Sequence, residues 1–211
     1  MKKIRILVVD DENVVREGFV AILKLQADMQ VVGEAQNAQE AIQIIRRTAC
    51  DAVVLDIALP GPSGLTVLDE LKSESERPPI LIMSMHDEEL YGIRALRAGA
   101  SGFLMKDSFP EELIKAIRKI ASGRKYISPS LGEILASELT SRQMPLHETL
   151  SDREFQILCL IASGKTLKEI GESLCISGKT VSTYRARILE KMGMKTNAEM
   201  ITYVLKHKLI E

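Results

Sequence analysis

Five polar side chains in the first half of the chain each end a short apolar run. Asp10 and Asp11 follow "ILVV", Asp56 ends "AVVLD", Ser84 ends "PILIMS", and Lys106 ends "GFLMK". Runs this short and apolar are typical of strands buried on both faces of a parallel sheet. Ligands of such sheets gather beyond the carboxyl ends of the strands. We therefore expect three carboxylates, one hydroxyl and one ammonium group to meet at one edge.

The acidic part of this set favours a hard cation. Carboxylate oxygens without neighbouring His or Cys ligands suit Mg²⁺ better than a transition metal. The chain has no Walker lysine loop and no G-x-G-x-x-G turn, so a bound nucleotide is not expected. A divalent ion would also explain why two like charges, Asp10 and Asp11, stand side by side. The alternative interpretation is helix capping, since an Asp ahead of a helical pattern is a good N-cap.

Apolar runs alternate with helical patterns from residue 4 to about residue 122. The predicted strands are 4–9, 29–35, 52–56, 79–84 and 102–106. The predicted helices lie near 14–25, 38–47, 65–73, 88–98 and 111–121. This alternation predicts an α/β doubly wound (βα)5 domain, a five-stranded parallel sheet with helices on both faces. The stretch "LPGPSGL" after Asp56 supplies a tight turn, with Pro60 and Gly64 as its turn residues.

The pattern changes after residue 122. Residues 123–146 hold one short helical pattern, roughly Pro129 to Leu139, and then a polar stretch that is typical of an interdomain connector. Beyond it no strand pattern recurs. Helical segments are predicted near 152–163, 167–174, 178–193 and 197–207. The expected organisation is a first domain at 1–122, a linker at 123–146 and an all-α four-helix domain at 147–211.

Length and composition fit two ordinary domains with real cores. The chain has 211 residues, of which 45% are apolar. Residues 1–122 hold 15 basic and 19 acidic side chains, a net charge of −4, whereas residues 147–211 hold 10 and 8, a net charge of +2. The basic excess weakly favours nucleic acid as a partner of the second domain. Three widely spaced cysteines suit a reducing compartment, and no run approaches membrane-spanning length, so we expect a cytoplasmic protein without a membrane partner.

The motifs "VVDDE", "VVLDIALPGPSGL", "MSMH" and "GFLMKD" together resemble the receiver domain of bacterial two-component response regulators, a flavodoxin-like fold, over residues 4 to about 121. The resemblance implies that Asp56 accepts a phosphoryl group from a sensor histidine kinase. It also implies that Asp11, Asp56 and the backbone carbonyl of Ala58 ligate Mg²⁺, with Asp10 acting through a metal-bound water. The chemistry agrees, because a dication offsets the charge of an incoming phosphate and of the attacking carboxylate.

Three further residues complete the receiver pattern. Lys106 supplies a fixed positive charge beside a phosphoryl oxygen, and the Ser84 hydroxyl can turn to donate to the new phosphate. Phe103 matches the aromatic switch position of receivers and would move inward with Ser84; plain core packing is the alternative role. Receivers usually follow the lysine with proline, whereas Asp107 follows here, as is common in one branch of the family.

The second domain has the spacing of a helix-turn-helix. In the segment 178–193, Val181, Ile188 and Met192 share one face, and the opposite face is polar towards its N-terminal end. That end of a recognition helix meets base edges, while flanking cations take phosphates. The residues expected to contact DNA are Lys179, Thr180, Ser182, Thr183, Arg185, Ala186, Arg187 and Lys191. A basic, solvated helix in a small bundle is the alternative.

The segments "LSDRE", "GKTLKEIGESLCIS" and "KTVSTYRARILEKMG" resemble the LuxR-type helix-turn-helix, in particular the NarL/FixJ branch that joins it to a receiver. Tyr184 stands where many members have His. The resemblance implies a homodimer on double-stranded DNA, paired through the last helix, with RNA polymerase as an expected partner. The expected function is a transcriptional regulator that phosphorylation of Asp56 activates.

Two other functions compete with this expectation. An aspartyl-phosphate phosphatase also uses a carboxylate at a strand end, but it places a second acid two residues later, where this chain has Ala58. A phosphatase would also leave the helix-turn-helix unexplained, so the protein is not expected to be an enzyme. A phosphate-independent regulator with the same DNA-binding output is the second alternative, although every expected receiver residue is present.

Overall fold

The computed structural model describes residues 2–72, 74, 77–85, 88–140, 145–207 and 209–210. The chain divides into two compact units, 1–139 and 140–211, and each is described by itself. Residues 141–144 of the predicted linker and residue 73 of a predicted helix lie outside the described part. The predicted linker helix belongs to the first unit. Among the described residues, no helix is both long and apolar enough to cross a membrane.

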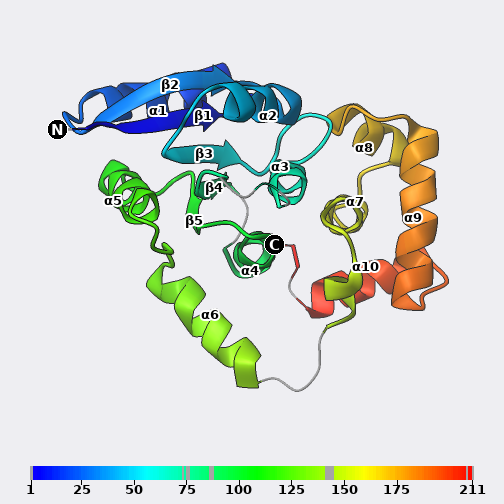
Figure 1. Ribbon diagram of the computed structural model, residues 1–211. Coiled ribbons are helices and arrows are strands. Elements are labelled where there is room, and N and C mark those ends of the chain that lie inside the picture. Colours follow the sequence, from blue (N-terminus) through cyan, green and yellow to red (C-terminus); the bar gives the residue numbers. More distant parts are fainter. Residues whose placement is uncertain are drawn as a thin grey trace. The chain divides into compact units, whose positions relative to one another are not determined.

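The first unit is built on a five-stranded parallel sheet with the order β2-β1-β3-β4-β5 (Figure 1). This confirms the doubly wound class, because the strand order reverses direction after β1. The strands are β1 (Ile4–Val9), β2 (Met29–Ala35), β3 (Ala52–Asp56), β4 (Ile80–Ser84) and β5 (Gly102–Met105). The central residues of β1, β3, β4 and β5 are almost completely buried, as expected for strands covered on both faces, whereas the edge strand β2 is only partly buried.

Helices cover both faces of this sheet. One face packs against α1 (Asn13–Lys24) and α5 (Pro110–Ala121), whose Phe19, Leu23 and Ile117 join the strands in one hydrophobic core. Three other helices follow one another across the sheet: α2 (Ala38–Arg47), α3 (Gly64–Leu71) and α4 (Glu88–Ala98). Helix α3 contacts both α2 and α4. The predicted helix limits agree with these bounds to within one or two residues.

The chain stays attached to the sheet after α5. Tyr126 forms an isolated bridge with Gly102 of β5 and is buried, and its hydroxyl donates a hydrogen bond to Glu112. Then α6 (Pro129–Thr140) begins, with Ser128 Oγ accepting a hydrogen bond from Leu131 N and donating one of 2.6 Å to Glu88 Oε1 of α4. The segment predicted to be a connector is therefore packed on the edge of the first unit.

The second unit is all helical. A short 3-10 helix, η1 (Leu146–Thr149), precedes α7 (Asp152–Ala162), α8 (Leu167–Ser173), α9 (Gly178–Met192) and α10 (Asn197–Lys206). This confirms the predicted four-helix domain; η1 was not predicted. Ser151 and Thr166 form complete capping boxes at α7 and α8, since each hydroxyl is paired with a Glu three residues later.

The turn between α8 and α9 depends on a close backbone approach. A Cβ atom on Gly171 would lie 2.7 Å from the carbonyl oxygen of Ile176, so only glycine fits without a shift. Cys175 in this turn has a φ of 52°, in the left-handed region. Ser177 then caps α9 by accepting a hydrogen bond from Thr180 N. The helix-turn-helix spacing read from the sequence is therefore present in the fold.

Candidate functional site

Three carboxylates meet at the carboxyl edge of the sheet. Asp10 follows β1, Asp56 ends β3, and both are buried, whereas Asp11 is exposed. Each of the three offers an oxygen atom, and these atoms all lie within 4.8 Å of one another. The parallel strands produce this convergence, because β1 and β3 are neighbours and end at the same edge.

Lys106 places an ammonium group inside this acidic cluster. Its Nζ atom donates a hydrogen bond of 2.8 Å to Asp56 Oδ2, lies 2.8 Å from Asp10 Oδ2, and is only 5% exposed. Burial favours the neutral amine, but the attraction of the Asp10 and Asp56 carboxylates outweighs it and raises the pKa of Lys106. The group therefore stays charged and balances part of the negative charge of the cluster.

The acidic pair at the end of β1 carries an electrostatic cost. Burial raises the pKa of Asp10, and the neighbouring charge of Asp56 adds to the effect, while Lys106 opposes it. Asp11 is exposed as a whole, but partial desolvation of its carboxylate is the largest cause of its raised pKa. Both carboxylates are thus harder to ionise than in water, which is the condition that a bound cation relieves.

Helix capping does not explain the pair. The N-cap of α1 is Glu12, which makes no side-chain capping bond. Asp10 Oδ1 accepts a hydrogen bond of 2.9 Å from Glu12 N, which orders the loop ahead of the helix. Asp10 Oδ2 is buried and has no well-directed hydrogen bond, although the Lys106 ammonium lies beside it. A buried carboxylate oxygen in this state fits a divalent cation or its bound water.

Backbone contacts fix the position of Asp56. Its Oδ1 atom accepts a hydrogen bond of 3.1 Å from Ala58 N, so both carboxylate oxygens have donors. The turn after β3 brings Gly64 against the same residue, and a Cβ atom there would lie 2.2 Å from the backbone oxygen of Asp56. Gly64 N also donates to Ile57 O at 3.0 Å. The predicted turn therefore presses directly on the end of β3.

Ser84 and Phe103 occupy neighbouring strands and are fully buried. Ser84 ends β4 beside β3, and its carbonyl oxygen accepts a hydrogen bond of 2.8 Å from Lys106 N. Phe103 pairs in register with Ile82 of β4, on the opposite sheet face from the core beneath α1 and α5. The structure thus brings together five of the expected residues at one edge of the sheet: Asp10, Asp11, Asp56, Ser84 and Lys106. Phe103 lies in β5, three positions before Lys106.

The expected DNA-facing residues lie on α9, and most of them are exposed. Ser182, Thr183, Ala186 and Arg187 are exposed, opposite the buried face formed by Val181, Ile188 and Met192. Lys179 and Thr180 are exposed at the N-terminal end of the helix, where the Thr180 hydroxyl is shared with the capping Ser177. The helix therefore presents a polar face of small side chains beside flanking cations.

Two of the expected phosphate contacts are already paired within the domain. Arg185 Nε donates to Asn197 Oδ1 of α10 at 2.6 Å. Lys191 Nζ donates to Glu154 Oε2 of α7 at 2.6 Å, and Glu154 is buried. Sequence reasoning missed Glu154, although the spacing of Ser151 and Glu154 is a capping-box signature that marks it. No comparable signal was available for Asn197.

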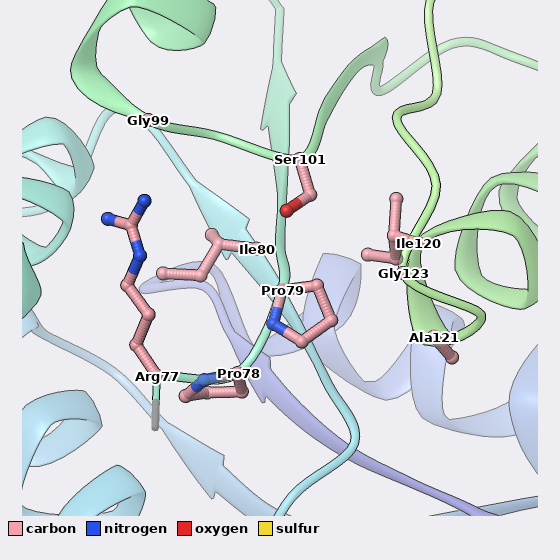
Figure 2. Close-up of a pocket in the computed structure, with 9 residues that line it drawn as sticks. All are labelled: Arg77, Pro78, Pro79, Ile80, Gly99, Ser101, Ile120, Ala121 and Gly123. Carbon is pink, nitrogen blue, oxygen red and sulfur yellow. The ribbon is translucent and has the colours of Figure 1, made fainter. Parts of the chain in front are cut away.

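A separate cavity of about 240 Å³ lies near the starts of β4 and β5 and the end of α5. Figure 2 shows Arg77 and Pro79 beside Ile80, with the Ser101 hydroxyl facing the cavity. None of the candidate site residues lines it. It opens where β4 and β5 begin, whereas the acidic cluster lies where the strands end, so the two are different places on the first unit.

Comparison with known proteins supports one family for this arrangement. Residues 6–118 match the family described as response regulator receiver domain, and residues 148–204 match the bacterial regulatory proteins of the luxR family. The oxygen regulatory protein NreC of Staphylococcus aureus (strain JH9) is 37% identical over 98% of this chain and 99% of its own length. The chain is a response regulator of the NarL/FixJ family.

Solved structures agree with this assignment. The response regulator ChrA of a heme-sensing two-component system is 31% identical, with complete coverage of both chains and a TM-score of 0.55. The receiver domain of NarL from Mycobacterium tuberculosis is 38% identical over 59% of this chain, with a TM-score of 0.57. RcsB of Salmonella typhimurium shares the fold at 23% identity and a TM-score of 0.71. The response regulator is thus a DNA-binding protein of a two-component system, as the sequence predicts.

Proposed function

We propose that Asp56 is the phosphoryl acceptor of this response regulator and that a sensor histidine kinase is the donor. An Asp56 oxygen would attack the phosphorus of a phosphohistidine, so that a P–O bond forms while the P–N bond breaks and the imidazole leaves. The observation that carries this assignment is the position of Asp56, beside Asp10 and Asp11 and in contact with Lys106.

The same residues fit Mg²⁺. Asp11, Asp56 and the carbonyl oxygen of Ala58 would hold the ion directly, and the buried oxygen of Asp10 would hold one of its waters. When bound, Mg²⁺ would offset the negative charge that the phosphate brings. Lys106 holds a fixed cation beside the acceptor oxygen, and the Ser84 hydroxyl would donate to the phosphoryl group. Phe103 would follow Ser84 and change the surface around α4.

We assign two domains and a linker: a receiver at 1–122, a linker at 123–146, and a DNA-binding domain at 147–211. On α9, Ser182, Thr183 and Ala186 would face base edges, while other side chains would contact phosphates. The proposed phosphate contacts are Lys179, Thr180, Arg187 and, once released from their partners, Arg185 and Lys191. Two copies would bind two half-sites of double-stranded DNA.

The regulator would act with RNA polymerase, in the cytoplasm, where its three free cysteines would stay reduced. It is not an enzyme in the ordinary sense, because the group it takes ends on its own side chain. Release of that group by water would reset it.

Quantitative DNA-binding measurements test whether phosphorylation of Asp56 controls DNA binding. Wild-type protein and Asp56→Asn would be titrated onto DNA from the neighbourhood of the protein's own gene and onto random DNA, with and without a phosphodonor, at several salt concentrations. We expect the phosphodonor to tighten binding of the wild type to one site and to leave Asp56→Asn unchanged. An equal response of both proteins would favour the phosphate-independent alternative.

A further inference from the structure

Arg16 is one of the few charged side chains that are almost completely buried in the first unit, at 7% exposure. It lies in the second turn of α1, and the three nitrogen atoms of its guanidinium group reach three different places. Nη1 donates to the backbone oxygen of Asp10 at 2.7 Å, Nη2 to Asn13 Oδ1 at 2.6 Å, and Nε to Glu34 Oε2 at 3.3 Å. One planar cation therefore ties the end of β1, the start of α1 and the end of β2 together.

The loop that Arg16 holds is the one that carries the acidic pair. Its carbonyl contact is made to Asp10 itself, so the peptide between Asp10 and Asp11 cannot rotate without breaking a buried charge-assisted hydrogen bond. The neighbouring helix start offers little other support, because Glu12 makes no capping bond and the first turn of α1 holds no acidic residue. Asp10 is otherwise held by a hydrogen bond of 3.1 Å from its N to Ala35 O and by the local bond from Glu12 N to its Oδ1.

The positive charge of Arg16 also offsets the acidic side chains around this loop. Asp10, Asp11, Glu12 and Glu34 gather around this loop, and Arg16 is the buried cation on its β2 side, while Lys106 lies on its β3 side. A guanidinium group can serve this role better than an ammonium group, because its rigid fork satisfies three acceptors at fixed angles. The loop geometry and its charge balance therefore depend on the same side chain.

We propose that Arg16 is a positioning residue for the cation-binding and phosphoryl-accepting site, acting through the backbone of Asp10. The inference deepens the function proposed above and rests on it for the phosphoryl step. Groups that orient metal ligands without touching the metal typically contribute 10- to 100-fold to metal affinity. We therefore expect loss of the fork to weaken Mg²⁺ binding by about tenfold or more.

Arg5 supplies a matched control on β1, the strand that leads into this loop. Its Nε and Nη2 atoms donate to the two carboxylate oxygens of Asp51 at 3.0 and 2.9 Å, far from the acidic cluster at the opposite end of β1. Arg5→Lys would therefore break a forked arginine contact in β1 and leave the candidate site alone. Arg16→Lys breaks the fork while keeping the charge, and Arg16→Gln removes both.

The test measures Mg²⁺ dissociation constants by calorimetry on the full chain, with urea unfolding as a check on folding. Labelling rates with acetyl phosphate are then measured at saturating Mg²⁺. We expect Arg16→Lys to weaken Mg²⁺ binding about tenfold, Arg16→Gln to weaken it further, and Arg5→Lys to bind Mg²⁺ like the wild type.

Each outcome decides one question. Wild-type Mg²⁺ affinity in Arg16→Lys, or an equal loss in Arg5→Lys, would overturn the positioning role. Unfolding of both Arg16 variants while Arg5→Lys stays folded would make Arg16 a purely structural residue and would also overturn it. If Mg²⁺ binding depends on Arg16 but the wild type is never labelled, the positioning role stands and the proposed phosphoryl acceptance fails.

Discussion

Lys106 Nζ donates a hydrogen bond of 2.8 Å to Asp56 Oδ2, across 50 positions of sequence. The same ammonium lies 2.8 Å from Asp10 Oδ2, so one buried cation is shared by a proposed metal ligand and by the residue proposed to hold a metal-bound water. A phosphoryl group on Asp56 would occupy the space next to this oxygen. Lys106 would then exchange its carboxylate partner for a phosphoryl oxygen. The position of the Lys106 ammonium group therefore indicates where we expect that oxygen.

Lys106→Met should have opposite effects on folding and on Mg²⁺ binding. Without Mg²⁺, two buried carboxylates lose their shared cation, which should lower the free energy of unfolding by about 3 kcal/mol. Mg²⁺ should bind the variant more tightly than the wild type, because no ammonium group competes for Asp10 and Asp56. Urea unfolding over a series of Mg²⁺ concentrations measures both effects. Equal stability of the two proteins without Mg²⁺ would contradict the contact.

Asp11→Asn should reverse its effect when Mg²⁺ is added. Partial desolvation of its carboxylate raises the pKa of Asp11, so its folded-state pKa lies above the unfolded value. The protonated carboxyl group therefore stabilises the folded protein below the unfolded-state pKa. This contribution to the free energy of unfolding is lost as the pH rises through the folded-state pKa. At neutral pH without Mg²⁺ the variant should therefore be the more stable protein, and the difference should vanish in acid.

Saturating Mg²⁺ should stabilise only the wild type, by an amount that grows with the logarithm of its concentration. Unfolding experiments at neutral and acidic pH, each with and without Mg²⁺, cover the four conditions. The magnesium assignment would be refuted if Asp11→Asn gained as much stability from Mg²⁺ as the wild type.

Gly64→Ala should disturb Asp56 through the backbone. A Cβ atom at this position would lie 2.2 Å from the carbonyl oxygen of Asp56, so the turn or the end of β3 must shift. Overpacking of this kind costs about 1–3 kcal/mol, and labelling of Asp56 should slow with it. Gly18→Ala is the matched control, because nothing lies within 4 Å of its Cβ position inside α1. That variant should be stabilised by up to about 1 kcal/mol and labelled normally.

Lys191→Ala should lower the stability of the second unit, whatever its effect on DNA binding. The ammonium group of Lys191 binds the buried Glu154, whose pKa is lowered by hydrogen bonds from Lys191 and Ser151 against the opposing effect of burial. Because Lys191 is nearly half exposed, the expected loss of stability is modest, about 1 kcal/mol. A double-mutant cycle with Glu154→Gln measures it, and additive effects of the two variants would contradict the pair.

Lys179 is the better probe of phosphate contacts. It is exposed at the start of α9, and it contributes only its backbone oxygen to a described hydrogen bond, which it accepts from Thr183. Lys179→Ala should weaken binding to specific and random DNA alike and reduce the salt slope by about one. Thr183→Ala should instead reduce discrimination at one base pair by about 1 kcal/mol or more. Binding curves at several salt concentrations distinguish a phosphate contact from a base contact.

The sequence predicted the strands and helices well, because each apolar run is bounded by polar or turn residues. The convergence of Asp10, Asp56 and Lys106 also followed from sequence, since parallel strands end at one edge. The pairings of Arg16 with Asp10 and of Lys191 with Glu154 could not be predicted from the sequence. Such contacts depend on the rotamers of long side chains between elements, and no short-range pattern encodes them.

The linker illustrates the same limit. Its helical pattern was visible, but the attachment of Tyr126 to Gly102 and of Ser128 to Glu88 was not. A polar stretch with a weak pattern is typical of a free connector, and only the tertiary structure shows that its first part is packed against β5 and α4.

The most direct measurement is the intact mass of the full chain after incubation with acetyl phosphate and Mg²⁺. The wild type should gain one phosphoryl group that hydroxylamine removes, as expected of an acyl phosphate, and omission of Mg²⁺ should suppress the gain. Asp56→Asn, checked for folding by urea unfolding, should gain none. A variant labelled as fully as the wild type would contradict the assignment of Asp56 as the phosphoryl acceptor.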